Sequence, residues 1–96
     1  MNVHEFHERV AALGCVVCRR LGHGYVPASV HHISEGSSER SQWAVAPLCH
    51  EHHQGASGFH ARGKAFLVQF RVPGEIEHGL LVWMIEDLMK ENPWKK

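Results

Sequence analysis

The sequence predicts one small α+β domain, in which a zinc knuckle and flanking helices support a β-hairpin. The chain has 96 residues, the length of one domain, and we expect a single domain over 1–96. Two short strand-like segments lie between segments with helical spacing. Ten histidines and three cysteines are scattered along the chain. At this length a hydrophobic core alone is only marginally sufficient to stabilise the fold, so a bound metal is a plausible additional source of stability.

The first predicted element is a helix over residues 2–13. Apolar residues recur there at helical spacing, with polar residues between them: Val3, Phe6, Val10 and Leu13. Gly14 ends the run, as a glycine commonly does after a helix. Residues 15–24 follow as a knuckle with two cysteines and a glycine-containing turn.

Two strand-like segments come next, at residues 25–33 and 43–48. Pro27 confines the start of the first to an edge or irregular position. Pro47 ends the second. The segments are joined by a polar loop over 34–41, so a β-hairpin is predicted.

The second half of the chain is predicted to be mainly helical. A short helix is stopped by Gly55, and Pro73 with Gly74 divides two later helices. The segment 56–63 holds two glycines and is predicted to be a loop. The predicted helices are 48–55, 64–70 and 76–91.

Charge is balanced but unevenly distributed. The net charge is zero, which argues against a strongly electrostatic nucleic-acid binder. A local basic face is still possible, because cations surround the histidine-rich segment: Arg19, Arg20, Arg40, Arg62, Lys64 and Arg71. Acidic residues gather in the last quarter of the chain: Glu75, Glu77, Glu86, Asp87 and Glu91.

Cysteine usage and the lack of a leader indicate a reducing compartment. Three cysteines cannot all pair, and residues 1–13 do not resemble a signal peptide. No apolar run approaches the roughly 20 residues that a membrane span needs. We therefore expect a cytoplasmic protein with no membrane partner, in which Cys-x-x-Cys indicates a metal or redox motif.

Four residues have the spacing of a structural zinc site. Cys15 and Cys18 form a C-x2-C pair, and Cys49 and His52 a C-x2-H pair. His50 and His53 also lie near Cys49, and His53 is an alternative to His52 as the fourth ligand. Ordinary buried cysteines or a redox pair are the competing interpretations, although no thioredoxin-like βαβ pattern surrounds the motif.

The order of motifs resembles the HNH nuclease family. Val30-His31-His32-Ile33 ends a strand, and a loop, a second strand and Leu48-Cys49 follow. More specifically, GCVVC at 14–18, HHI at 31–33, PLCHEHHQG at 47–55 and GFH at 58–60 resemble the phage Ref branch of RecA-dependent nucleases. The resemblance covers about 14–70.

This resemblance implies a ββα-metal (HNH, or His-Me finger) core and a DNA endonuclease activity. His31 matches the family's strand metal ligand, and His32 its general base. His53 matches the metal-binding residue after the knuckle, and His60 a further histidine that we expect to be the third ligand. The implied cofactors are a structural Zn²⁺ and a second divalent ion, Zn²⁺ or Mg²⁺/Mn²⁺. The implied partners are DNA and a RecA filament.

The chemistry of phosphodiester hydrolysis supports these roles independently. It needs an activated water and a cation near the developing charge. Successive strand residues point to opposite faces. A His-His pair at a strand end can therefore place a base on one side of a phosphate and a metal on the other.

Other interpretations compete with this one. Ala44 stands where the family has an asparagine that braces the loop and orients the base, so another group, such as a backbone carbonyl, must hold His32. A non-catalytic zinc-binding module for nucleic acid or protein, such as a degenerate prophage nuclease, would keep only the knuckle ligands. In a separate interpretation His31 and His32 are both structural zinc ligands, or simply a polar strand end. A metalloprotease is excluded, because the spacing His-Glu-x-x-His is missing around Glu51.

Overall fold

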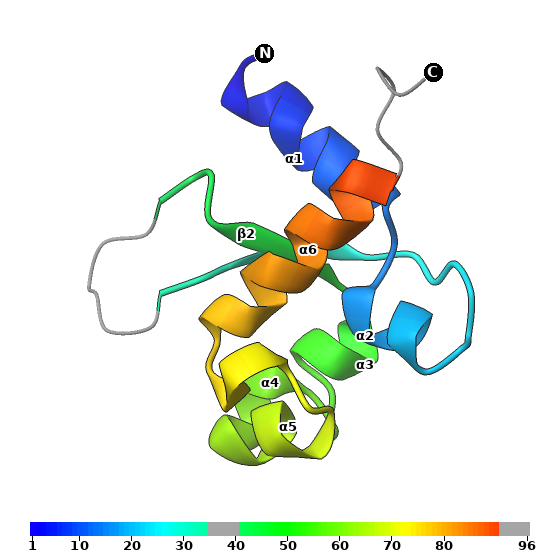
Figure 1. Ribbon diagram of the computed structural model, residues 1–96, viewed down its shortest axis with the longest axis vertical. Coiled ribbons are helices and arrows are strands. Elements are labelled where there is room, and N and C mark those ends of the chain that lie inside the picture. The colour runs from blue at the N-terminus through cyan, green and yellow to red at the C-terminus, as the bar shows by residue number, and fades with distance from the viewer. Residues whose placement is uncertain (35–40, 91–96) are drawn as a thin grey trace.

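The computed structural model of the protein describes residues 1–34 and 41–90 (Figure 1). Residues 35–40 of the predicted loop, with Arg40, and the predicted last helical residue, Glu91, lie outside this range. Within it, no helix is both long and apolar enough to cross a membrane. The elements are α1 (Val3–Ala12), α2 (Val16–Arg20), β1 (Ser29–His32), β2 (Val45–Leu48), α3 (His50–His53), α4 (Phe59–Arg62), α5 (Lys64–Gln69), η1 (Pro73–Glu75) and α6 (His78–Lys90).

Strands β1 and β2 form an antiparallel hairpin, as predicted, with His32 opposite Val45. Helix α6 packs against β2 and runs diagonally across the hairpin in Figure 1. All four residues of β2 are buried. In β1 burial alternates, because His31 points inward while Val30 and His32 are half-buried. This confirms a small α+β fold and sends the two adjacent histidines to opposite faces.

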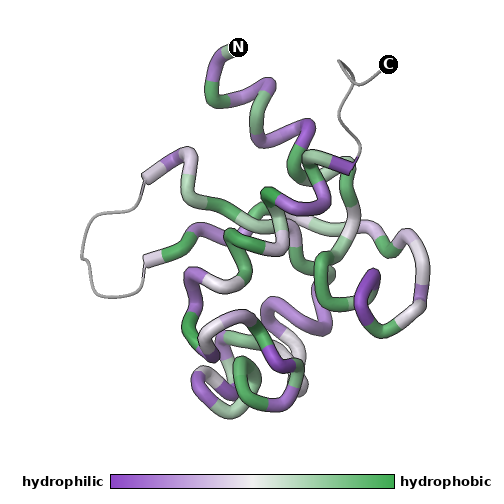
Figure 2. Tube along the Cα trace, in the orientation of Figure 1, coloured by the Kyte–Doolittle hydropathy of each residue, from purple (hydrophilic) through white to green (hydrophobic). Residues whose placement is uncertain are grey.

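The core lies where α1, α2, β2, α5 and α6 meet. Helix α1 begins at its cap Asn2, whose side-chain oxygen accepts a 2.8 Å hydrogen bond from the Glu5 amide. Hydrophobic and hydrophilic residues alternate along this helix in Figure 2, the pattern of an amphipathic element. The largest fully buried side chains include Val10, Val16, Val17, Val45, Leu48, Phe66, Leu80 and Met84.

Gly14 turns the chain from α1 into the knuckle, and the turn requires glycine. Its φ is +80°, and a Cβ there would lie 2.8 Å from the ring of Tyr25. The Cys15 amide then donates a 2.9 Å hydrogen bond to the Val26 carbonyl. The knuckle is therefore held close to the segment that leads into β1.

The start of the first strand and the predicted loop over 56–63 differ from the structure. The first strand begins only at Ser29, later than predicted, because Pro27 lacks the amide that a ladder needs. Residues 56–63 were expected to form a loop, yet they contain α4. Gly58 precedes this helix in an extended conformation and Gly63 follows it with a φ of +52°. The glycines flank a helix rather than exclude one.

A buried ion pair joins α2 to α6. Both Arg20 amino groups donate to the Asp87 carboxylate, at 2.9 and 3.0 Å, and Asp87 is fully buried. The Arg20 guanidinium also lies 4.7 Å from the centre of the Trp83 ring. Arg19 lies 3.7 Å from the same carboxylate, so these two arginines are paired with Asp87 and do not contribute to the possible basic face. Among the described residues of that set, the exposed cations are Arg62, Lys64 and Arg71.

Candidate metal centres

Three cysteines and one histidine from separate segments meet in the interior. Cys15 and Cys18 border the first turn of α2, Cys49 directly follows β2, and His52 lies on α3. All four are buried, and their ligand atoms lie within 4.8 Å of one another. The cysteines are free thiols. The Cys15 sulfur also caps α2 by accepting a 3.5 Å hydrogen bond from the Cys18 amide. We call this set the cysteine cluster.

The spacing of these donor atoms fits tetrahedral zinc. Zn–S bonds of about 2.3 Å and Zn–N bonds of about 2.0–2.1 Å place two sulfurs about 3.8 Å apart and a sulfur and a nitrogen about 3.5 Å apart. The sulfurs of Cys18 and Cys49 are 3.7 Å apart. The distances from His52 Nδ1 to the sulfurs of Cys15, Cys18 and Cys49 are 3.6, 3.4 and 3.2 Å. The cluster can hold a zinc ion with every position filled by protein.

Electrostatics in the cysteine cluster also favour a cation. Burial raises the pKa of the Cys15 thiol, and it raises the pKa of the Cys18 thiol to about 12, with the neighbouring thiols adding to the rise. The thiolate is the metal-binding form. Burial lowers the pKa of His52, which keeps its ring neutral. A divalent cation supplies the positive charge that adjacent thiolates need.

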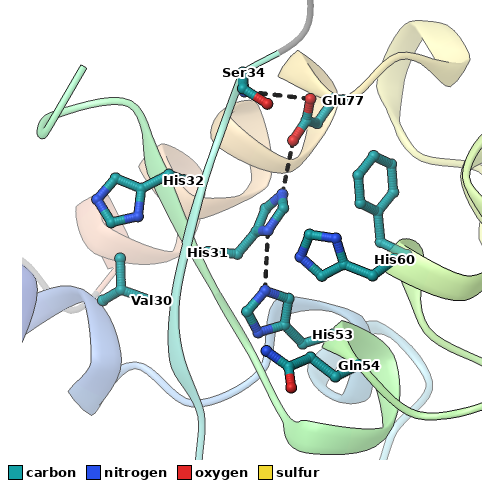
Figure 3. Close-up of a pocket in the computed structure, with 9 residues that line it drawn as sticks. Val30, His31, His32, Ser34, His53, Gln54, His60 and Glu77 are labelled. Atoms are coloured by element: carbon teal, nitrogen blue, oxygen red, sulfur yellow. Dashed lines mark hydrogen bonds and ion pairs between the residues drawn. The ribbon is translucent and has the colours of Figure 1, made fainter. Parts of the chain in front are cut away.

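A second cluster consists of His31 on β1, His53 on α3 and His60 on α4, with ligand atoms within 4.8 Å of one another. We call it the histidine cluster. The Nδ1 atom of His31 is 3.2 Å from Nε2 of His53, and the rings of His53 and His60 are centred 4.7 Å apart. Figure 3 shows the three rings gathered on one side of β1. Two imidazole nitrogens on one ion lie about 3.0–3.4 Å apart, so this arrangement fits a single ion.

Within the histidine cluster, solvent exposure increases from His31 to His60. His31 is buried, His53 is half-buried and His60 is exposed. The three side chains line a cavity of about 390 Å³ that is shared with Phe59 and Gln54. A site that opens to solvent on one side can keep a position for water or substrate, unlike the closed cysteine cluster.

The environment keeps His31 and His53 in the neutral, ligand-binding form. Burial lowers the pKa of His31. It also lowers the pKa of His53 to about 4, and the proximity of His31 and His60 adds to that effect. A neutral imidazole retains a lone pair for a metal ion.

Close packing of α4 on α3 brings His60 to His53. A Cβ at Gly58 would lie 2.6 Å from the carbonyl oxygen of Glu51 and 2.8 Å from the carbonyl carbon of His53. Both neighbours are backbone atoms, so only glycine allows this approach. The two short helices are thereby held side by side.

Glu77, just before α6, is a site residue that the sequence did not single out. It is 5% exposed, and its Oε2 lies 2.7 Å from Nε2 of His31. Its Oε1 accepts a 3.3 Å hydrogen bond from the Ser34 amide. A glutamate near a helix start is ordinary in sequence, because it complements the helix dipole. Only the tertiary fold brings it to β1 (Figure 3).

His32 lies on the other side of β1, away from the histidine cluster (Figure 3). Its Nε2 is 3.0 Å from the side-chain oxygen of Gln42. Gln42 therefore holds His32 through its side chain. With Ala44 in place of the family's asparagine, a group such as a backbone carbonyl was the expected partner. Because a carbonyl oxygen only accepts, the ring donates from Nε2, and the lone pair of the neutral tautomer with this contact is on Nδ1.

Helix α1 contributes a further histidine beside His32. The ring of His7 donates from Nε2 to the Gln42 backbone oxygen at 2.6 Å, and it meets the His32 ring edge-on with centres 5.5 Å apart. The sequence indicated no task for His7. Three other histidines without an expected role belong to neither cluster: His4, His23 and His78.

Comparison with known families shows which family the chain resembles. A family model described as recombination enhancement, RecA-dependent nuclease matches residues 2–88. The matched segment contains both clusters, together with His32 and Glu77. No curated protein and no solved structure matches the chain significantly.

Proposed function

This chain belongs to the recombination enhancement, RecA-dependent nuclease family, and we propose that it is a metal-dependent endonuclease that hydrolyses phosphodiester bonds in DNA. In this proposal the hairpin and α3 form a ββα-metal core of the HNH type. The cysteine cluster carries a structural zinc ion. The histidine cluster carries the catalytic ion, and His32 is the general base.

The proposal depends above all on the placement of His32 and the histidine cluster on opposite faces of β1 (Figure 3). In the described part of the chain β1 pairs only with β2, so no strand is hydrogen-bonded to its other edge. A phosphodiester lying across that edge would have the base on one side and the cluster on the other. Such an arrangement suits in-line displacement.

His32 would take the proton from the attacking water. The Gln42 oxygen fixes the proton on Nε2, so the Nδ1 lone pair is the basic atom. His7 holds the backbone oxygen of Gln42, which braces this arrangement from α1. General bases of this kind contribute about 10²–10⁴-fold to rate.

The histidine cluster would bind the ion through neutral imidazoles. When bound, a divalent ion there supplies a Lewis acid that stabilises charge on the phosphate and the leaving oxygen. The partly exposed side at His60 leaves room for the phosphate. Three imidazole donors favour Zn²⁺ or another transition ion, and Mg²⁺ or Mn²⁺ are the candidates for turnover.

From the family description we also propose the substrate, which is DNA held in a RecA filament. Exposed cations close in sequence to His60 support a contact with the phosphate backbone, because such contacts position a protein on nucleic acid. They are Arg62 and Lys64. A zinc-binding module without catalysis would need neither the histidine cluster nor His32.

A nicking assay tests the mechanism. Supercoiled plasmid and single-stranded circles, bare or coated with RecA, are incubated with wild type and His32→Ala over a range of metal concentrations. We expect His32→Ala to cut about 10²–10⁴-fold more slowly with the same metal content and fold. His4→Ala is the matched control, because His4 is 83% exposed and touches neither cluster.

Two results would contradict the proposal. If His32→Ala, folded and fully metallated, cuts as fast as wild type, His32 is not the base. If wild type cuts no nucleic acid with any of the metals, with or without RecA, the binding-module interpretation replaces the enzyme.

A further inference from the structure

Glu77 is a buried carboxylate whose two oxygens both have partners on or next to β1. One oxygen lies 2.7 Å from His31 Nε2, and the other accepts the Ser34 amide at 3.3 Å. The side chain of Glu77 is 6% exposed and that of His31 3%. Burying a carboxylate costs free energy unless it is hydrogen-bonded, so Glu77 depends on both of these partners.

The contact determines which nitrogen of His31 carries the proton. An ionised carboxylate can only accept hydrogen bonds. His31 must therefore be protonated on Nε2 in this contact, because a lone pair there would face the negative charge. The lone pair of the neutral ring is then on Nδ1, the atom 3.2 Å from His53 Nε2. Glu77 thus turns the ligand atom of His31 toward the rest of the histidine cluster (Figure 3).

We propose that Glu77 is a positioning residue of the second metal site, which holds His31 as the Nε2–H tautomer and thereby strengthens its Nδ1 as a metal ligand. This inference rests on one part of the proposed function, namely that the histidine cluster holds a metal ion. A carboxylate behind a metal-binding histidine fixes the orientation of the ring and raises its basicity, and its loss typically costs about 10–100-fold in metal affinity.

This role links the segment just before α6 to the metal site. Glu77 lies 46 positions from His31 in sequence and directly before α6, which packs against β2. The cluster is therefore supported from two directions. His53 and His60 are set by the packing of α3 on α4, whereas His31 is set by the start of α6.

Zinc titration of the protein loaded at the cysteine cluster tests the inference. Glu77→Gln keeps the size of the side chain and one acceptor oxygen but removes the charge. We expect it to bind the second zinc ion about 10–100-fold more weakly than wild type, with the cysteine-bound zinc and the melting temperature unchanged. Glu75→Gln is the matched control, because this nearby carboxylate is exposed and its loss should leave zinc affinity unaltered.

The ¹⁵N chemical shifts of His31 give a second readout, which a merely structural role of Glu77 would not move. We expect a pure Nε2–H tautomer in wild type and a mixture in Glu77→Gln before the second ion is added. A wild-type ring protonated on Nδ1 overturns the inference even if the variant does not fold. Wild-type zinc affinity and tautomer in a folded Glu77→Gln overturn it as well.

The same titration separates this inference from the proposed function. If wild type binds two ions and Glu77→Gln binds both as tightly, only the role of Glu77 is wrong. If wild type binds one ion per chain, the proposed catalytic ion is wrong, and the role of Glu77 is wrong with it.

Discussion

At the scale of single residues, the neighbours His52 and His53 belong to different clusters. Successive side chains on a helix point about 100° apart. His52 is buried beside the cysteines, with Nδ1 3.2 Å from the Cys49 sulfur, while His53 is half-buried and contacts His31. One helical turn thus places side chains in two clusters with different solvent exposure.

His53→Ala should remove one metal ion per chain and leave the other in place. The variant loses a donor of the histidine cluster but none of the cysteine cluster. We expect metal content measured after dialysis to fall by about one ion, with the circular dichroism of the folded protein retained.

The adjacent His50→Ala is the control for this measurement. His50 lies on the same helix but is exposed and belongs to neither cluster. Its substitution should leave metal content unchanged. Equal metal content in His53→Ala and wild type would place His53 outside any metal site.

At the scale of elements, the histidine cluster depends on how two very short helices pack. Helices α3 and α4 have four residues each, far fewer than the about 12–15 that an isolated helix needs to be even marginally stable. Tertiary contacts must therefore hold them. The contact at Gly58, where backbone approaches backbone, is one of these.

Gly58→Ala should weaken the second metal site without affecting the first. The added Cβ would lie 2.6 Å from a backbone oxygen of α3, so α4 must shift and carry His60 away from His53. We expect weaker zinc binding at the histidine cluster and unchanged zinc at the cysteine cluster, both measured by competition with a chelating dye.

Ala56→Gly provides a comparison in the same turn, because Ala56 is exposed. It should leave both zinc affinities close to wild type. Tight binding of two ions by Gly58→Ala would show that α4 does not position a ligand.

At the scale of the whole molecule, the cysteine cluster joins parts of the chain that are far apart. It connects α2 with the end of β2 and with α3, while the pair of Arg20 and Asp87 connects α2 with α6. A domain of this size buries a relatively small core. Zinc coordination is therefore expected to be a large part of its folding free energy.

Cys18→Ser should unfold the domain or empty its cysteine cluster. Zinc-coupled folding of small domains is worth about 10–16 kcal/mol, compared with a marginal domain stability of about 5 kcal/mol. We expect loss of the cooperative thermal transition in circular dichroism, together with loss of bound zinc. A folded Cys18→Ser protein with full zinc content would refute the assignment of these ligands.

The sequence alone predicts those features that depend on local spacing. Helix α1 follows from apolar periodicity, and α6 from the division that Pro73 and Gly74 make between two helical segments. The hairpin follows from two short strand-like runs around a polar loop. The spacing of Cys15 and Cys18, and of Cys49 and His52, selects four residues that do lie together in the fold. The alternation of side chains along β1 predicts that His31 and His32 point to opposite faces.

The tertiary structure alone decides which distant groups support these residues. Helix α4 was expected to be a loop, because local propensity favours a loop and only packing on α3 stabilises the helix. Glu77 meets His31, Gln42 meets His32, and Asp87 meets Arg20 through contacts that no spacing along the chain encodes. Burial forces the carboxylates of Glu77 and Asp87 to find partners, and burial is a property of the complete fold.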